Sequence, residues 1–279
     1  MPNLIDQTAD IGRRTVDAIE NFGHFVGFAG RTANWMFTGW RKWCRRDLMI
    51  PQLYEIGTLS VPVIAILGIF IGMVLSIEAY DQFAALGQEQ RLGGVINISV
   101  VKQIGPVLAA VMIAGRVGGS ISAELGTMRV TEQLDALRVM GADPVGHLVV
   151  PRVIACLIMT PILTIFADLM GILGGYLITV QFYGVQAQGY WDFSARFVTS
   201  WDIFTGLSKS VVFGLSLGLI SCYKGFYCRR GAAGVGQAAT DAFVTSFITI
   251  IIANLFLAKA FKELYDVIFG HTGMSAFSG

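Results

Sequence analysis

Five long apolar stretches constrain this chain more than any other feature of its sequence. They cover about residues 59–80, 98–125, 153–182, 203–226 and 243–269. About 20 consecutive apolar residues in a helix cross the hydrocarbon core of a bilayer, which is about 30 Å thick. Charged residues make up only 14% of the 279 residues, whereas a soluble domain carries about 25%. We therefore predict an all-α integral membrane protein with about five transmembrane helices.

Glycine and proline indicate how these stretches pack. GxxxG pairs at residues 68–72 and 214–218 permit close helix approach. The third stretch is too long for one straight crossing. It forms either one long, tilted helix kinked at Pro161 or two short pieces in a re-entrant hairpin. We favour the single helix because only Asp168 interrupts its apolar character.

Aromatic segments flank the apolar stretches. In residues 1–50 aromatic side chains alternate with basic ones, which is typical of a helix at the lipid headgroups: Trp35, Phe37, Trp40 and Trp43 with Arg41, Lys42, Arg45 and Arg46. Residues 183–202 predict a second interfacial helix on the opposite, periplasmic side. We divide the chain into an N-terminal cytoplasmic or interfacial segment, residues 1–50, and a transmembrane domain, residues 51–279. The first segment lacks the apolar run of a cleaved signal peptide.

The distribution of Lys and Arg sets the predicted orientation, because cytoplasmic connections are enriched in both. One side receives seven N-terminal cations, including Arg13, Arg14 and Arg31, together with Arg129, Arg138, Arg152, Lys224, Arg229 and Arg230. The other side receives Arg91, Arg196, Lys259 and Lys262. We therefore place the N-terminus in the cytoplasm and the C-terminus outside. The formal net charge of +1 gives no indication of a nucleic-acid partner.

A polar segment, residues 115–144, separates the second and third stretches. Four apolar side chains share one helical face over residues 130–140: Val130, Leu134, Leu137 and Met140. Gly141 suits a C-terminal cap, and Pro144 stops the helix. The pattern predicts a short amphipathic helix, which either lies on the membrane surface or docks into a groove on a soluble partner.

Charged residues inside the apolar stretches are candidate functional groups. Lys102 and Arg116 lie fourteen residues apart, about 21 Å along a helix. At least one of them therefore sits at hydrophobic depth, facing a polar cavity, unless both side chains snorkel outward. Glu124 follows Arg116 by two turns, and we predict a structural ion pair between them. Lys209 lies close enough to the end of its stretch to snorkel, and Asp168 is a candidate intramembrane acid without an evident base.

Several kinds of chemistry are missing from the sequence. It contains no GxxxxGK[ST] phosphate loop, no GxSxG elbow and no HExxH motif. The histidines (His24, His147, His271) are far apart, and the cysteines (Cys44, Cys156, Cys222, Cys228) lack metal-ligand spacing. We expect no metal, no cofactor, no ATP hydrolysis by this chain, and unpaired cysteines that serve packing.

The run AELGTMRVTEQLDALRVMGADP, residues 123–144, closely resembles the signature of the MlaE family, the permease subunits of ABC-type lipid transporters that work with MCE proteins. Shorter matches occur at residues 52–54, 104–107, 151–152 and 209–213. The resemblance implies a homodimeric, five-span permease in a bacterial inner membrane. It would move phospholipid or a similar lipid between that membrane and an MCE-protein channel, as in maintenance of outer-membrane lipid asymmetry. The expected partners are a separate ABC ATPase, an MCE-domain (MlaD-like) protein and a STAS-domain (MlaB-like) protein.

The resemblance also assigns residues. Lys102 and Gln103 fall where many members carry an Arg-Glu pair lining a lipid cavity, and Lys209 matches a cavity lysine. The predicted lipid-binding residues are therefore these three, although Gln103 lacks the family's carboxylate and Lys102 offers a point charge rather than a bidentate fork. The residues expected to contact the ATPase lie on the short amphipathic helix, which would act as a coupling helix: Glu132, Gln133, Leu134, Asp135, Leu137 and Arg138.

Two other classes of function are compatible with parts of the sequence. A scaffold that anchors an MCE assembly without translocating lipid would need no ATPase and would tolerate changes in the coupling helix. An intramembrane enzyme would use Asp168 or Glu124 as its acid.

Overall fold

The computed structural model of the chain describes residues 4–39 and 46–270. Within these residues the secondary structure is helical, with no β-strand. Five helical runs are long and apolar enough to cross a membrane: Asp47–Ala85, Glu89–Val130, Val145–Phe182, Ser200–Phe226 and Ala232–Ile268. The predicted all-α, five-span architecture is confirmed. Most runs extend beyond the predicted stretches, because a helix continues past its apolar part into polar turns.

Several of these runs contain more than one helical element. The first span joins α3 (Arg46–Ile56), η1 (Thr58–Ser60) and α4 (Val61–Ala85). The second joins η2 (Glu89–Arg91), α5 (Leu92–Ser99), η3 (Val100–Ile104), α6 (Gly105–Ile113), η4 (Ala114–Gly118) and α7 (Gly119–Val130). The third joins η5 (Val145–Val149), α9 (Val150–Tyr176) and η6 (Leu177–Phe182). The fourth and fifth are α11 (Ser200–Phe226) and α12 (Ala232–Phe269).

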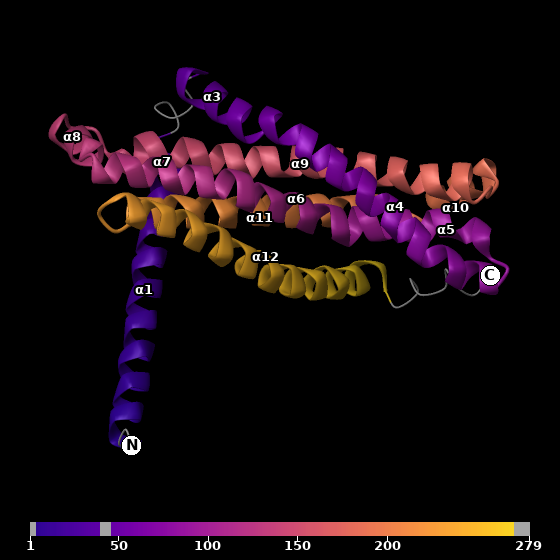
Figure 1. Cartoon of the computed structure of the whole chain (residues 1–279), viewed down its shortest axis with the longest axis horizontal. Coiled ribbons are helices and arrows are strands. Elements are labelled where there is room, and N and C mark those ends of the chain that lie inside the picture. Colours follow the sequence, from indigo (N-terminus) through magenta and orange to yellow (C-terminus); the bar gives the residue numbers. More distant parts are fainter. Residues whose placement is uncertain (1–3, 40–45, 271–279) are drawn as a thin grey trace.

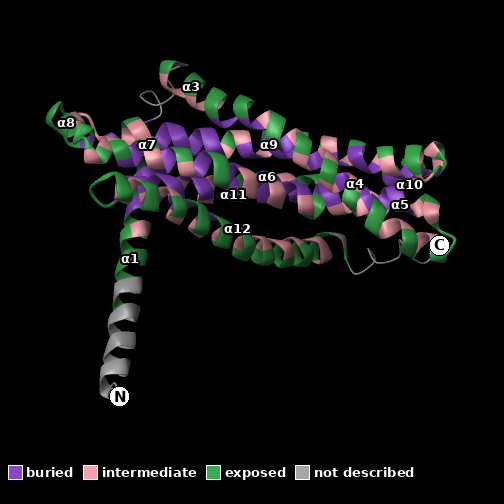
Figure 2. Ribbon diagram, in the orientation of Figure 1, coloured by how far each residue is buried: buried purple, intermediate pink, exposed green. Residues whose placement is uncertain are grey.

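The spans lie side by side along the long axis of the molecule, with α8 (Gln133–Val139) at one end and α10 (Ala187–Phe197) at the other. Helix α9 packs against both α4 and α11, and α11 also contacts α7 and α12. Buried residues concentrate on α6, α7, α9 and α11, whereas α12 is mostly exposed (Figure 2). The third span is one continuous helical run with Pro161 inside α9, so the single-helix prediction is confirmed and the re-entrant hairpin is wrong.

Both GxxxG pairs bring their helices into close contact with α9. A Cβ atom at Gly72 of α4 would collide with the carbonyl oxygen of Gly171. A Cβ atom at Gly214 of α11 would lie 2.6 Å from the carbonyl oxygen of Cys156. Since the hydrophobic effect does not drive helices together inside lipid, such backbone contacts supply the van der Waals packing that holds the bundle.

Four π-helical segments interrupt the second and third spans, and nothing in the apolar pattern predicts them. Two lie in the second span, where η3 carries Lys102 and Gln103 and η4 carries Arg116. The other two, η5 and η6, begin and end the third span. A π turn adds a residue to the helical turn, so it changes the face that later residues occupy, and such turns are frequent at functional sites.

Helix α1 (Leu4–Thr38) leaves the bundle and runs across the direction of the spans (Figure 1). This direction fits the predicted in-plane N-terminal helix. Its last turns dock onto the bundle, where Trp35 Nε1 donates a hydrogen bond to Asp143 Oδ2 at 2.7 Å. Residues 40–45, with Trp40, Arg41, Lys42, Trp43, Cys44 and Arg45, lie outside the described residues, as do His271 and the side chains of Arg13, Arg14 and Arg46. The division at residue 50, which falls inside α3, stays a prediction.

The predicted aromatic helix over residues 183–202 is shorter than expected, because α10 covers only Ala187–Phe197, and one side of it is buried against the bundle. Tyr190 of α10 is buried, and its hydroxyl donates to Asn97 Oδ1 of α5 at 3.1 Å. Burial raises the pKa of Tyr190 to about 12, so its phenol stays neutral and keeps this proton at ordinary pH. Trp191 remains exposed. Cys156, Cys222 and Cys228 are free and buried, as predicted.

Candidate functional site

The three predicted lipid-binding residues lie together where η3 meets α11. Lys209 Nζ of α11 donates to Gln103 Oε1 at 2.7 Å and to the carbonyl oxygen of Lys102 at 3.2 Å. Lys102 Nζ lies 2.8 Å from Asp202 Oδ1, at the start of α11. We call Lys102, Gln103, Asp202 and Lys209 the cation cluster.

Lys209 does not snorkel, so that prediction from its position is wrong. Its side chain is buried, and the residue exposes only 1% of its surface. The cause is close packing: a Cβ atom at Gly206, one turn earlier, would collide with the carbonyl oxygen of Val101. With α11 pressed against η3 in this way, the ammonium group hydrogen-bonds to the neighbouring oxygens rather than to water, which offsets its loss of solvation.

Asp202 is a functional candidate that sequence reasoning missed. Its Oδ2 accepts hydrogen bonds from the Thr199 backbone N–H at 3.0 Å and from Thr199 Oγ1 at 2.7 Å, which closes a capping box at the start of α11. Its Oδ1 is the partner of Lys102. The Thr-x-x-Asp spacing could have identified the cap, but no local pattern connects Asp202 to a lysine in another span.

The cation cluster carries one net positive charge, from two lysines and one aspartate with Gln103 neutral. Lys102 is its accessible charged member, because 47% of the side chain is exposed whereas Asp202 and Lys209 are buried; the neutral Gln103 is also exposed. The cluster can therefore bind a singly charged anionic group through Lys102, whereas both carboxylate oxygens of Asp202 are already engaged by Lys102 and Thr199.

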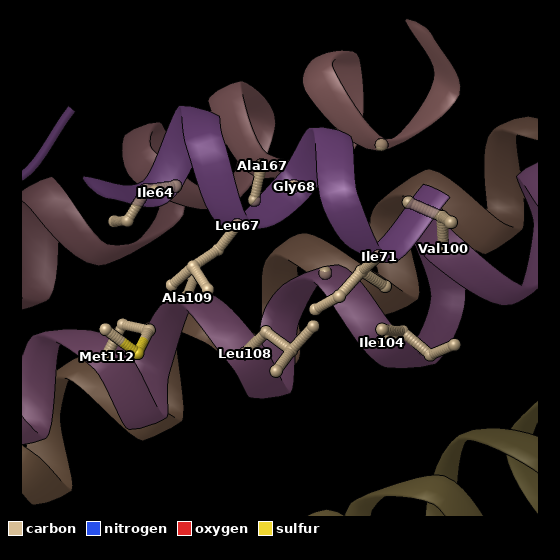
Figure 3. Close-up of a pocket in the computed structure, with 12 residues that line it drawn as sticks. Ile64, Leu67, Gly68, Ile71, Val100, Ile104, Leu108, Ala109, Met112 and Ala167 are labelled. Carbon is tan, nitrogen blue, oxygen red and sulfur yellow. The ribbon is translucent and has the colours of Figure 1, made fainter. Parts of the chain in front are cut away.

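An apolar seam lies beside η3, lined by side chains of α4, the second span and α9 (Figure 3). Ile71, Ile104 and Leu108 point into it. Its volume is about 10 Å³, room for about one water molecule. The seam is thus a packing contact between spans and not a chamber for an acyl chain. Asp168 lies next to it against Gly105, and its Oδ1 has no hydrogen-bond partner among the described residues.

The predicted Arg116–Glu124 ion pair does not form. Glu124 Oε1 instead lies 2.6 Å from Nη2 of Arg152, a buried residue of α9, and Arg116 Nη1 donates to Ser60 Oγ at 2.6 Å. The helical spacing assumed a regular α-helix, but Arg116 lies in the π-helical η4, and its side chain reaches η1 of the first span. A buried guanidinium such as that of Arg152 requires a carboxylate partner, which Glu124 supplies.

The short amphipathic helix begins later than predicted. Val130 is the last residue of α7, and α8 covers Gln133–Val139 instead of residues 130–140. Between the two helices Glu132 has φ 59°, in the left-handed region that L-residues adopt at a cost. This residue ends α7 and lets the chain start a new helix, which the periodicity of the apolar residues could not indicate.

The apolar face of α8 divides into a buried and an exposed part. Leu134 exposes 2% of its surface and belongs to the main hydrophobic core. The prediction that it contacts a partner is therefore wrong, because its side chain already packs inside this chain. Leu137 is half-buried, whereas Val139 exposes 88% of its surface and Met140 is also exposed. Neither Val139 nor Met140 was among the predicted contact residues.

The polar residues of the predicted ATPase-coupling set lie on or directly before the same short helix as this exposed apolar pair. Glu132, Gln133, Asp135 and Arg138 are exposed, and Arg138 Nη1 lies 2.7 Å from Asp135 Oδ1. An exposed ion pair of this kind contributes little to stability. We call Glu132, Gln133, Asp135, Val139 and Met140 the α8 face; it lies at one end of the bundle (Figure 1).

Comparison with known proteins gives consistent results. The sequence profile described as Permease MlaE matches residues 49–260. A probable ABC transporter permease protein of Rickettsia felis is 39% identical over 261 residues, which cover 94% of this chain and 100% of the relative. A probable ABC transporter permease protein of Synechocystis is 43% identical, over 75% of this chain and 80% of the relative. The intermembrane phospholipid transport system permease protein MlaE of Haemophilus influenzae is 34% identical, over 73% and 78% respectively.

Proposed function

The chain belongs to the MlaE permease family and is a permease subunit of an ABC transporter, and we propose that its cargo is a phospholipid or a similar anionic lipid. The transporter exchanges the lipid between the inner membrane and a channel formed by an MCE-domain (MlaD-like) protein. A separate ATPase supplies the energy, two copies of this chain form the membrane part, and a STAS-domain (MlaB-like) protein accompanies the ATPase. The N-terminus and α8 lie on the cytoplasmic side.

The cation cluster is the observation that carries this proposal. A phospholipid has an anionic phosphate, which the exposed ammonium group of Lys102 can bind. The net charge of the cluster is +1, so one phosphodiester neutralises it. A sterol or another neutral lipid has no anion for Lys102 and would leave the net positive charge of the cluster uncompensated.

The path from ATP hydrolysis to this cluster follows the second span. We infer that the ATPase binds the α8 face and moves α8 when it hydrolyses ATP. Because α8 contacts α7, α7 moves with it. From α7 the same helical run continues through η4 and η3 to Lys102 and Gln103. The two π-helical segments are the places where this run can change its register and turn the cluster relative to α11.

A transport assay tests the proposal. The complete transporter, with its ATPase and MCE-domain protein, is reconstituted in vesicles, and ATP-dependent transfer of a fluorescent phospholipid is measured for wild type, Lys102→Gln and Lys262→Gln. Lys262 is an exposed cation of α12 that does not belong to the cation cluster, although its neighbour Phe261 packs against Phe204 near the start of α11. We expect transfer to fall about ten- to a hundredfold only in Lys102→Gln, since loss of one charge-assisted contact costs about 1.5–3 kcal/mol. Equal transfer by all three proteins would remove Lys102 from the lipid path.

The same reconstituted vesicles distinguish the permease from the scaffold alternative. A non-translocating anchor would hold the MCE-domain protein in the membrane, yet ATP would cause no lipid transfer even in the wild type. ATP-dependent transfer by wild type and its loss in variants of the α8 face support the permease.

A further inference from the structure

A second cationic site lies at the α8 end of the bundle, where α11 passes into α12. A groove of about 620 Å³ opens there between α1, α11 and α12. Its lining includes Asn21, Tyr223, Lys224, Tyr227, Arg229 and Arg230. We propose that this groove binds the anionic headgroup of a membrane phospholipid, which in the proposed orientation belongs to the cytoplasmic leaflet. The site is separate from the cation cluster, which lies nearer the α5 end (Figure 1).

The cations of the groove are available to a ligand. Lys224, Arg229 and Arg230 form neither an ion pair nor a side-chain hydrogen bond within the part of the chain that the structure describes. The acid on the lining, Asp241, is engaged along its own helix, because its Oδ1 accepts a hydrogen bond from Gln237 Nε2 at 2.8 Å. Three unpaired cations against one engaged carboxylate give the groove a net positive charge that suits a phosphate group.

The backbone around these cations is held in place. Gly231 has φ +92°, a conformation that permits the turn from α11 into α12. A Cβ atom at Gly234 would collide with the carbonyl oxygen of Arg229, so the first turn of α12 packs closely on the loop. On the other side Arg129 Nη1 donates to the carbonyl oxygen of Phe226 at 3.0 Å and secures the end of α11. The groove therefore keeps its shape without a ligand.

The wall formed by α1 indicates that the ligand is a lipid. Phe28 packs its ring against Tyr223, with centroids 5.6 Å apart, which fixes α1 beside the groove. Earlier in α1 an exposed apolar stripe has helical spacing and continues away from the bundle: Val16, Ile19, Phe22 and Val26. A helix that exposes such a stripe while running across the spans (Figure 1) lies at the lipid surface. The groove is thus at headgroup depth, with apolar side chains next to it for the acyl chains.

Native mass spectrometry of the full chain in detergent tests the proposal. Phosphatidylglycerol or phosphatidylcholine is added at the same concentrations to wild type and to the triple variant Lys224→Gln, Arg229→Gln, Arg230→Gln. The matched control is Lys259→Gln, Lys262→Gln, which removes two exposed cations from the opposite end of α12. Circular dichroism and gel filtration show whether each variant keeps the native fold.

We expect the wild type and the control to retain one more phosphatidylglycerol than phosphatidylcholine per chain. The triple variant should bind phosphatidylglycerol about a hundredfold more weakly, because each of the three lost cations contributes about 1 kcal/mol to anionic-lipid binding. Unchanged retention in the triple variant, or an equal loss in the control, overturns the proposal. Displacement of the lipid by millimolar inorganic phosphate would overturn it too, by assigning the groove to a soluble phosphate. If the triple variant does not fold, Arg230→Gln alone replaces it. Weaker binding of phosphatidylglycerol by Arg230→Gln then supports the proposal, and unchanged retention overturns it.

Discussion

Replacing Val139 by Asp distinguishes docking by the α8 face from packing within the chain. Val139 exposes 88% of its surface, so the change should alter the free energy of unfolding by no more than about 0.5 kcal/mol. Burying a valine in an interface contributes about 1.5–3 kcal/mol, and a carboxylate there adds a desolvation cost. We therefore expect affinity for the ATPase to fall about ten- to a hundredfold, with unchanged expression and thermal stability.

Leu134→Ala provides the contrast. Leu134 is buried in the core, and removing a buried leucine side chain costs about 2–5 kcal/mol of unfolding free energy. This variant should lose thermal stability before it loses affinity. Leu86→Asp, at an exposed position after α4, controls for the effect of adding a carboxylate.

The assay measures binding of the separately purified ATPase to the detergent-solubilised permease, together with the thermal denaturation of each variant. The reasoning would be refuted if Val139→Asp bound the ATPase as tightly as wild type. It would also be refuted if Leu134→Ala kept wild-type stability and lost binding alone, because Leu134 would then be a contact residue.

Three further changes test other parts of the structure. Asp202→Asn releases Lys102 and weakens the α11 cap by about 1 kcal/mol. Lipid analysis should then find more anionic lipid bound per chain. Less bound lipid would contradict the idea that Asp202 competes with the lipid for Lys102. Glu124→Gln leaves the buried guanidinium of Arg152 without its carboxylate, and thermal denaturation should show a loss of about 1–3 kcal/mol, whereas no loss would mean that the pair is dispensable. Gly72→Leu forces α4 away from α9 and should abolish folded protein in gel filtration; a monodisperse, stable variant would contradict the close packing.

The number and order of the spans follow from the sequence, because apolar length alone decides whether a helix can cross a bilayer. The close contacts of Gly72 and Gly214 were also predictable, since small residues at a spacing of four leave a groove for a neighbouring backbone. The presence of a helix over Ala187–Phe197 follows from the aromatic composition of its segment. Its burial against Asn97 does not, because that contact depends on tertiary packing.

The misses have three physical causes. Helical periodicity assumes 3.6 residues per turn, but η4 changes the register between Arg116 and Glu124, and Glu132 breaks the helix before α8. Periodicity also identifies an apolar face without saying what covers it, so Leu134 was assigned to a partner although its own chain buries it. The burial of Lys209 was missed because it depends on how closely Gly206 approaches the second span.

We propose that Lys102 holds a phospholipid for an ATP-driven permease. The most direct test is to purify tagged wild type and Lys102→Glu in mild detergent and to identify the proteins and lipids that accompany each. The account predicts that the ATPase and the MCE-domain protein accompany both forms, because the α8 face is intact in each. It also predicts that a defined anionic phospholipid accompanies the wild type and is strongly depleted in Lys102→Glu, where the cation near Asp202 is replaced by a second carboxylate. The same phospholipid in equal amount from both forms would contradict the account.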